Sequence, residues 1–316
     1  TKADAIMTFH DANLAVTVGK EESFSVMMVD RYGNRLSADL QDGESIIVLV
    51  EGTPDPCSGN IGVTEFNSKV QAPLNPNGQY KVSYTPQVAG NVKLSILLRS
   101  QGGLLTTFFH NPDFTRPVLG NADHLHFSDN ASPWCPEDIN YSCDSTLLSK
   151  QISFDWGLDS PLKYDSSFPL DYFSIQWQGE IRAPTTDLYT FTAHLDGDAR
   201  LRIGSELVLD SIVDSSSDTL SGTLYLEEGK FYDLDLEYVH SLDEAFISLS
   251  WETSEITFQP VPSEYLYFKR HIGNGLKNLT SPIELISSPG EIDVKTSAQG
   301  DGLSGCIAMQ ECSFVV

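Results

Sequence analysis

The sequence predicts an all-β protein made of short strands, and three observations support this fold class. Between positions 171 and 210, three runs alternate apolar and polar side chains, as strands with one buried face do. The first hundred residues hold further runs of this kind, with turn sequences about every 8 to 12 residues. The turns are rich in Gly, Asp, Asn and Pro, which suit tight backbone turns. The three runs of the first region are Phe173-Ile175-Trp177, Tyr189-Phe191-Ala193 and Leu201-Ile203.

The first hundred residues predict an immunoglobulin-like sandwich, because their strands are short, alternating and separated by turns. Two segments in this region also carry a family pattern, FSVMMVDRYGNRL and NGQYKVSYTPQVAGNVKLSILL. They contain an Asp-x-x-Gly-Asn turn and a Gly-x-Tyr-x-Val-x-Tyr-x-Pro-x-x-x-Gly stretch. Residues 1–101 therefore resemble a filamin-type immunoglobulin-like repeat, although the usual closing motif of that repeat is missing. The alternating runs are Phe24-Val26-Met28, Ile46-Val48-Val50, Tyr80-Val82-Tyr84 and Val92-Leu94-Ile96-Leu98.

The next segment, residues 102–268, carries the motifs GGLLTTFFHNPDFTRPVL, ISFDWGLDSP, DYFSIQWQGEIRAPTTDLYTFTAHLDGDARLRIGSELVLD and EYVHSLDEAFISLSWETS. In this order they resemble the domain family named after anthrax protective antigen, written here as PA-fourteen. The resemblance implies an antiparallel β-sandwich or barrel, found in adhesins, glycosidases and toxins and often binding carbohydrate. We expect Asp196-Gly197-Asp198 to close a tight hairpin between the second and third alternating runs. An insert at about 121–150 is unusual for the family.

After this domain we expect a linker at 269–281, rich in Gly, Asn and polar residues. The tail at 282–316 then resembles the opening of a second filamin-type repeat. An internal comparison supports this, because the segment from Gly302 to Phe314 parallels the segment from Asn13 to Phe24, with one extra residue. The sequence therefore predicts a repeat, a PA-fourteen domain and a partial second repeat, as a piece of a longer array.

Composition excludes several classes of partner. The 316-residue chain has a net charge of −25, whereas nucleic-acid binding needs a basic surface. The same charge disfavours anionic membranes, and no apolar run approaches the length of a membrane span. We therefore expect no nucleic-acid partner and no direct membrane insertion. A hydrophobic content of 40% is ordinary for a globular protein.

Cysteine and sequon positions predict an extracellular or cell-surface glycoprotein. The five cysteines form two close pairs, for which we expect local disulfides, and Cys57 is left without a predicted partner. Three Asn-x-Ser/Thr sequons are present, and two of them flank the first cysteine pair. The predicted disulfides are Cys135–Cys143 and Cys306–Cys312, and the predicted glycosylation sites are Asn130, Asn140 and Asn278.

The resemblance also implies a candidate calcium site. In lectin-like members of the PA-fourteen family, two consecutive aspartates after a TFT strand hold calcium, and a second loop completes the site and selects the sugar. Here the pair falls on Asp196 and Gly197, so the second aspartate is absent, and Asp198 is the nearest substitute. Calcium prefers oxygen ligands of this kind. The candidate calcium ligands are Asp196, Asp198 and Asp243, and the candidate carbohydrate contacts are Asp196, His240, Asp243 and Glu244.

The competing interpretation of this turn is purely structural. Asp and Gly tolerate a positive φ and bond their own backbone, so Asp196-Gly197-Asp198 would form a tight turn without any ligand. A metal pair at His124 and His126 is also conceivable from spacing, but no third ligand lies nearby in the sequence and exposed histidines are the simpler interpretation. We expect Trp156, Trp177 and Trp251 to lie in the core and Trp134 to be exposed.

Catalytic motifs are missing from the sequence. There is no HExxH, no GxSxG and no phosphate-binding loop, and the formal GxGxxG at 300–305 does not lie between a strand and a helix. We expect a non-enzyme. Three functions stay open: a surface module for adhesion or recognition that binds glycans or other surface proteins, a structural subunit of an extracellular filament, wall or appendage built from copies of itself, and an accessory region of a larger carbohydrate-active enzyme.

Overall fold

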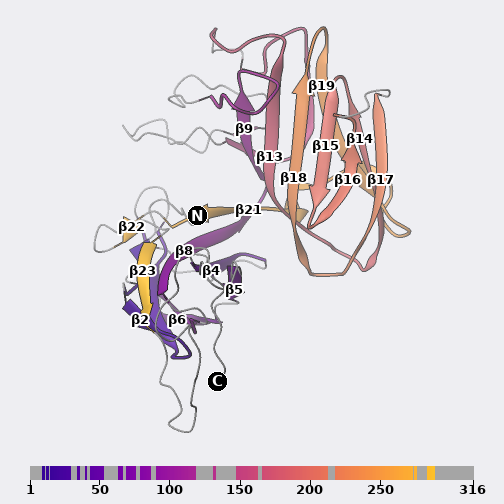
Figure 1. Ribbon diagram of the computed structural model, residues 1–316. Helices are drawn as coiled ribbons and strands as arrows, with labels where there is room; N and C mark the ends of the chain where they lie inside the picture. Colours follow the sequence, from indigo (N-terminus) through magenta and orange to yellow (C-terminus); the bar gives the residue numbers. More distant parts are fainter. Residues whose placement is uncertain are drawn as a thin grey trace, which may run out of the picture. The chain divides into compact units, whose positions relative to one another are not determined.

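The computed structural model in Figure 1 shows an all-β chain, which confirms the predicted fold class. No α-helix is present in the part of the chain that it describes, only a short 3-10 turn at Ser263–Tyr265, and none of its helices could span a membrane. The chain divides into unit 1, Thr1–Arg99 with Lys269–Val316, and unit 2, Ser100–Phe268. The described residues are 9–10, 12–13, 15–29, 34–35, 40, 43–52, 63–66, 69–75, 79–86, 90–118, 131–132, 147–162, 166–212, 218–272, 274–275 and 283–288.

Unit 1 is a sandwich of two sheets around one core. One sheet has the order β22-β1-β3-β7-β6 and the other β5-β4-β8-β23-β2. The alternating runs place Val26, Val82 and Leu94 in the core with no exposed surface, as one-sided burial predicts. The strands are β1 Phe9–His10, β2 Ala15–Thr17, β3 Glu22–Met27, β4 Ser45–Gly52, β5 Val63–Phe66, β6 Lys69–Asn75, β7 Gln79–Tyr84, β8 Gly90–Gln101, β22 Asn274–Gly275 and β23 Ile283–Ser288.

The last described strand, β23, belongs to unit 1. It pairs antiparallel with β8, with Leu285 opposite Val92, and parallel with β2, with Ser287 opposite Val16. The prediction that a second repeat begins at 282 is therefore wrong for this strand, which closes the first repeat instead. Its physical role is to hydrogen-bond two strands that would otherwise be edges of the sheet. The similarity of 302–314 to the N-terminal segment lies outside the described residues.

Unit 2 is consequently an insertion in unit 1, placed before the closing strand of the repeat. The two ends of unit 2 are hydrogen-bonded to each other: the N–H groups of Gly102 and Gly103 both donate to the carbonyl of Leu266, at 2.9 and 3.3 Å. Gly102 and Gly103 have φ of 120° and 148°, which other residues rarely adopt. The missing closing motif of the first repeat is thus explained, because its last strand comes after the insertion.

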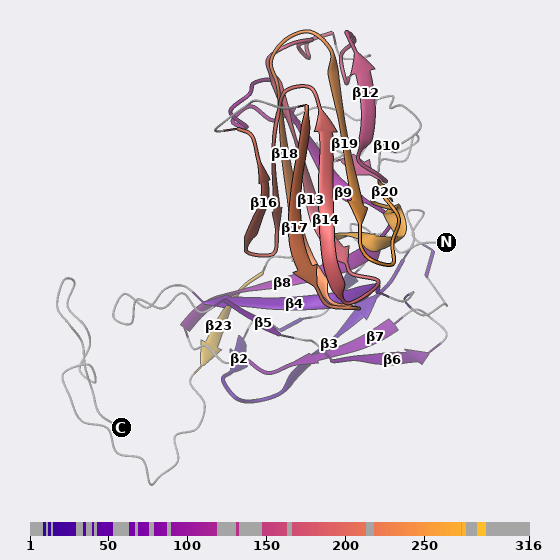
Figure 2. The same ribbon diagram turned by 90° about the vertical axis from the view of Figure 1, so that its right-hand side faces the viewer.

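Unit 2 is also built from two sheets, whose strands run along its length in Figure 2. One sheet carries β13 at its centre, with β18, β15 and β16 on one side and β9 and β21 on the other. The second has the order β12-β19-β14-β17, with β20 beside β19. The strands are β9 Leu104–Phe109, β10 Ala131–Ser132, β11 Leu147–Ser149, β12 Ser153–Gly157, β13 Phe173–Arg182, β14 Asp187–Leu195, β15 Asp198–Ile203, β16 Glu206–Asp210, β17 Thr219–Leu226, β18 Phe231–His240, β19 Ala245–Glu252, β20 Gln259–Pro260 and β21 Leu266–His271.

The core of unit 2 lies between these sheets and combines aliphatic side chains with several buried aromatic ones. Trp177 and Trp251 have no exposed surface, which confirms their predicted place in the core. Trp156 is partly buried and its ring stacks on Phe154 with centroids 5.2 Å apart. Trp134 lies outside the described residues. Large aromatic side chains of this kind contribute much of the apolar area that a sandwich buries.

The three alternating runs of the 171–210 region are strands β13, β14 and β15, as predicted, but the expected hairpin does not form. β14 pairs with β17 and β19, whereas β15 pairs with β16 and β18 in the other sheet. The turn at Asp196–Gly197 therefore carries the chain from one sheet to the other across the core. Alternation shows only that each strand has one buried face. It does not distinguish neighbours within a sheet from strands that face each other.

Candidate functional site

Three loops meet at one end of unit 2, and we call them the apical loops: Leu170–Tyr172 before β13, Asp196–Asp198 between the sheets, and Ser241–Glu244 between β18 and β19. The Tyr172 N–H donates to the Ser241 carbonyl at 3.1 Å. The first residue of β13, Phe173, pairs with the last residue of β18, His240. The sequence-predicted turn and the sequence-predicted second loop are therefore brought together by the fold.

The backbone of the acidic turn is fixed on both sides. The Asp196 N–H donates to the Phe246 carbonyl at 3.1 Å, and the Asp196 carbonyl accepts a hydrogen bond from the Tyr238 hydroxyl at 2.6 Å. Gly197 has a φ of 108°, and a Cβ at this position would lie 2.4 Å from the Val239 carbonyl oxygen. A side chain at position 197 is therefore excluded by both backbone conformation and space.

Asp198, the first residue of β15, has one carboxylate oxygen, Oδ1, that is buried without a hydrogen-bond partner. Burial raises the pKa of the Asp198 carboxyl, and Ser211 lowers it by hydrogen bonding. The charged form of Asp198 is thus penalised by desolvation. An unpaired buried oxygen of this kind is uncommon in folded proteins and marks the turn as an unusual position.

His240 lies in the core beneath the apical loops. Its side chain has no exposed surface, and its ring centroid is 4.9 Å from that of Phe173. Neither ring nitrogen has a hydrogen-bond partner, and Nε2 lies 3.7 Å from Oδ1 of Asp171. Burial lowers the pKa of His240, although Asp171 and Asp196 act in the opposite direction. The prediction that His240 contacts a sugar is corrected here, because a fully buried ring cannot reach a ligand at the surface.

The exposed part of the apical loops is both apolar and acidic. Leu170, Tyr172 and Leu242 are 56%, 54% and 52% exposed, and Asp243 and Glu244 are also exposed. Tyr172 has a φ of 59°, which is rare for a bulky residue. Sequence reasoning did not find Leu170, Tyr172 and Leu242, because an apolar residue next to a strand is ordinarily assigned to the core. The signal in the sequence that could have identified these three residues is that they lie next to, or within, the segments predicted to form the site.

The candidate calcium ligands do not reproduce the site that the resemblance implies. Position 197 cannot carry the second aspartate in this backbone, and the Asp196 carbonyl is already bonded to Tyr238. Within the described residues, no three His, Cys, Asp or Glu side chains gather into a group that could hold a metal ion. Calcium requires six to eight oxygen ligands. The residues present therefore do not fit the two-aspartate calcium site of the lectin-like members.

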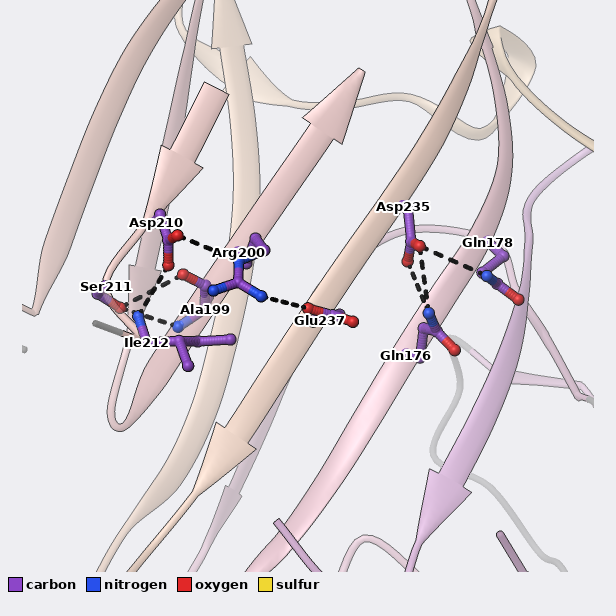
Figure 3. Close-up of polar contacts among 9 residues, drawn as sticks. All are labelled: Gln176, Gln178, Ala199, Arg200, Asp210, Ser211, Ile212, Asp235 and Glu237. Carbon is purple, nitrogen blue, oxygen red and sulfur yellow. Dashed lines mark hydrogen bonds and ion pairs between the residues drawn. The ribbon is translucent and has the colours of Figure 1, made fainter. Parts of the chain in front are cut away.

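A second polar surface, on the outer face of the β15-β18-β13 sheet, satisfies its own hydrogen bonds (Figure 3). Arg200 lies between Asp210 and Glu237, at 3.1 and 3.5 Å. A separate cluster lies on the same face, in which Asp235 accepts hydrogen bonds from the amide nitrogens of Gln176, at 3.0 and 3.2 Å, and Gln178, at 3.5 Å. Because these groups pair with one another across strands, the face is explained by sheet stability.

Several predicted positions lie outside the described residues. They include all the predicted disulfide and glycosylation positions, and both histidines considered as a metal pair. These predictions stay open: Cys57, Cys135, Cys143, Cys306, Cys312, Asn130, Asn140, Asn278, His124 and His126.

Two β-sandwich units, one inserted in the other, define a modular all-β protein whose loops gather at one end of the inserted unit. Family models identify both units: the PA14 domain matches residues 103–265, and the Filamin/ABP280 repeat matches residues 7–102. The PA14 match covers more than half of the sequence, so the chain belongs to the PA14 domain family, with a filamin repeat as unit 1. Both sequence resemblances are confirmed.

The chain is similar to a segment of a curated bacterial protein. The anti-sigma-I factor RsgI3 of Acetivibrio thermocellus is 33% identical over 116 residues. This alignment covers 37% of the present chain but only 18% of that protein. The matched segment is therefore a small part of that protein, most of which the present chain does not span.

Solved structures give further similarities. An anti-sigma factor domain-containing protein from Clostridium clariflavum is 29% identical, with a TM-score of 0.41, over 52% of this chain and 47% of that one. The epithelial adhesin 6 A domain from Candida glabrata, solved in complex with Galb1-3GlcNAc, is 17% identical, with a TM-score of 0.36, over 53% of this chain and 87% of that one.

Proposed function

We propose that this chain is a segment of an extracellular or cell-surface protein that acts in adhesion or recognition. Unit 2 binds a glycan through its apical loops, and unit 1 is the repeat that carries it. Membership of the PA14 domain family supports this function, because the sequence resemblance implies a fold that often binds carbohydrate. Under this proposal the protein has no catalytic activity of its own.

The observation that carries the proposal is the exposure of Leu170, Tyr172 and Leu242, with Asp243 and Glu244, on two loops that the hydrogen bond from Tyr172 to Ser241 joins. Large apolar side chains exposed on neighbouring loops can form the apolar part of a binding surface. A binding surface for a small ligand typically combines apolar contacts with a few polar groups that fix its orientation. Carboxylates accept hydrogen bonds from sugar hydroxyls, and an aromatic ring packs on the apolar face of a pyranose.

Binding of the intact chain to immobilised glycans, measured by surface plasmon resonance, tests the proposal. The double variant Asp243→Asn with Glu244→Gln replaces two exposed carboxylates by amides, each with one acceptor oxygen in place of two, and we expect its affinity to fall about 10- to 100-fold. The control is Gln178→Ala, an exposed residue on the outer face of the sheet, which we expect to bind like the parent. Equal affinity of all three proteins for the same glycan would contradict the proposed site.

Two alternatives make different predictions for the same chain. The filamin repeat of unit 1 favours the first alternative, a structural subunit of a filament, wall or appendage. In that case, purified protein self-associates at high concentration and binds no glycan. If it is an accessory region of a carbohydrate-active enzyme, glycan binding persists but the full-length protein carries a catalytic module. Light scattering and the full-length sequence separate these cases.

A further inference from the structure

We propose that the apical loops bind an uncharged saccharide without calcium, with Tyr172 as the ring that stacks on the sugar. This inference rests on the glycan-binding function proposed above and specifies its ligand class and its metal requirement. It is carried by three independent features of the described residues: the backbone at Gly197, the presentation of Tyr172, and the charge of the three loops.

The backbone at Gly197 argues for binding without calcium. A second aspartate at this position would place its Cβ 2.4 Å from the Val239 carbonyl oxygen, closer than real Cβ atoms come to other heavy atoms. Hydrogen bonds from Asp196 to Phe246 and from Tyr238 to Asp196 hold the turn in this conformation. The turn therefore cannot present two adjacent carboxylates to one cation, so under this proposal direct contacts hold the sugar.

Tyr172 is presented to solvent in a conformation that its neighbours enforce. Its φ is 59°, and its N–H donates to the Ser241 carbonyl, which ties the ring-bearing residue to the second loop. The left-handed conformation is strained for a residue with a Cβ, and strain of this kind concentrates at functional positions. The side chain is nevertheless 54% exposed, so its place is not explained by burial.

The charge of the apical loops selects against anionic ligands. They contain Asp171, Asp196, Asp198, Asp243 and Glu244 and no Lys or Arg. An ionised carboxylate only accepts hydrogen bonds, so its partner must donate them. Sugar hydroxyls donate, whereas the carboxylate of a sialic acid or a sulfate group only accepts and is repelled by charge.

The buried polar groups below these loops agree with this assignment. His240 is fully buried beside Asp171, with both ring nitrogens unpartnered, and burial favours its neutral form. It therefore supplies no positive charge that would offset the carboxylates above it. In the apical loops themselves, Oδ1 of Asp198 is a polar atom that the fold does not satisfy.

The test is an array of neutral, sialylated and sulfated oligosaccharides, probed with the intact chain in calcium and in a chelator. Tyr172→Gly removes the ring and relieves the strained φ, so it retains or raises the melting temperature while testing the contact. Tyr172→Phe keeps the ring and serves as the matched control. We expect neutral glycans to bind equally in both buffers, with affinity lost about tenfold or more in Tyr172→Gly and kept in Tyr172→Phe.

The other outcomes are distinguishable. Glycan binding that disappears in chelator, that favours sialylated or sulfated glycans, or that is unchanged in Tyr172→Gly overturns this inference and leaves the proposed function standing. No binding to any glycan in either buffer by a folded protein overturns the proposed function as well.

Discussion

At the scale of single residues, Glu237 is a carboxylate whose partial burial lowers the stability of the folded protein at neutral pH. Its side chain is half-buried on the outer face of the sheet, and burial raises the pKa of its carboxyl, followed in size by repulsion from Asp235. Arg200 acts in the opposite direction but does not cancel the effect. The ionised carboxylate is therefore less favourable in the folded protein than in the unfolded chain.

The pH dependence follows from this shift. Because the folded protein binds a proton on Glu237 at a higher pH than the unfolded chain does, the destabilisation is present at neutral pH. It is relieved as the pH falls through the folded pKa toward the unfolded value. We expect the parent to gain melting temperature relative to Glu237→Gln between pH 7 and about pH 4.5. If the difference in melting temperature between the two proteins stays constant across this pH range, Glu237 does not titrate as described.

Gly197 gives a second prediction at this scale. Gly197→Asp restores the pair of adjacent aspartates of the lectin-like family pattern, but the new Cβ meets the Val239 carbonyl oxygen. We expect a loss of about 2 kcal/mol or more of unfolding free energy, measured by urea denaturation, and no stabilisation by added calcium. Gly229→Ala, which has a φ of 74° and no atom within 4 Å of its new Cβ, is the control for backbone strain alone. A variant that is stabilised by calcium would mean that the turn can rearrange into the family site.

At the scale of elements, β23 decides whether unit 1 is complete. It lies between β2 and β8 and hydrogen-bonds with both, so removing it exposes two strand edges at once. A chain ending at residue 281 lacks β23, whereas a chain ending at 288 keeps it. We expect the shorter chain to lose the cooperative unfolding transition of unit 1 and to keep that of unit 2, as measured by calorimetry. Identical unfolding transitions in both chains would contradict the assignment of β23 to unit 1.

How much of this could be predicted from sequence depends on how local the signal is. The strand that contains Tyr189 and Phe191 was predictable, because the alternation of apolar and polar side chains is a pattern among residues close together in the sequence. The partner of β14 was not, since pairing within a sheet and packing across the core produce the same alternation. β23 was assigned to a new repeat because its partners lie 189 residues or more earlier in the chain (283 − 94 = 189 for the nearest pair). The motifs placed the acidic turn and the second loop correctly, but burial of His240 and exposure of Tyr172 depend on tertiary packing.

At the scale of the whole molecule, the insertion determines which unit bears an applied load. The described strands nearest the two chain ends, β1 and β23, belong to unit 1; β2, which follows β1, and β23 run parallel side by side. A force that pulls on the two chain ends therefore slides these strands past each other and loads their hydrogen bonds together. Unit 2 begins and ends within unit 1, so it bears no tension until unit 1 has opened.

Optical-tweezers extension of the chain from its two ends tests this order. We expect unit 1 to open first in every trace, followed by a step that releases Ser100–Phe268, at about 3.6 Å per residue. In a control, one handle is moved from the N-terminus to the exposed turn at Gly204–Ser205, which places part of unit 2 under load and should remove the fixed order. Traces from the chain ends in which unit 2 opens first would contradict the insertion.

The central claim is that the apical loops of unit 2 are the ligand-binding surface. Hydrogen exchange of the intact chain, with and without a saturating glycan identified on the array, tests it most directly. The account predicts slower exchange in Leu170–Tyr172, Asp196–Asp198 and Ser241–Glu244, and unchanged exchange in Gln176–Gln178 of the outer sheet face. Protection confined to the outer face or to unit 1, with the apical loops unchanged, would contradict it.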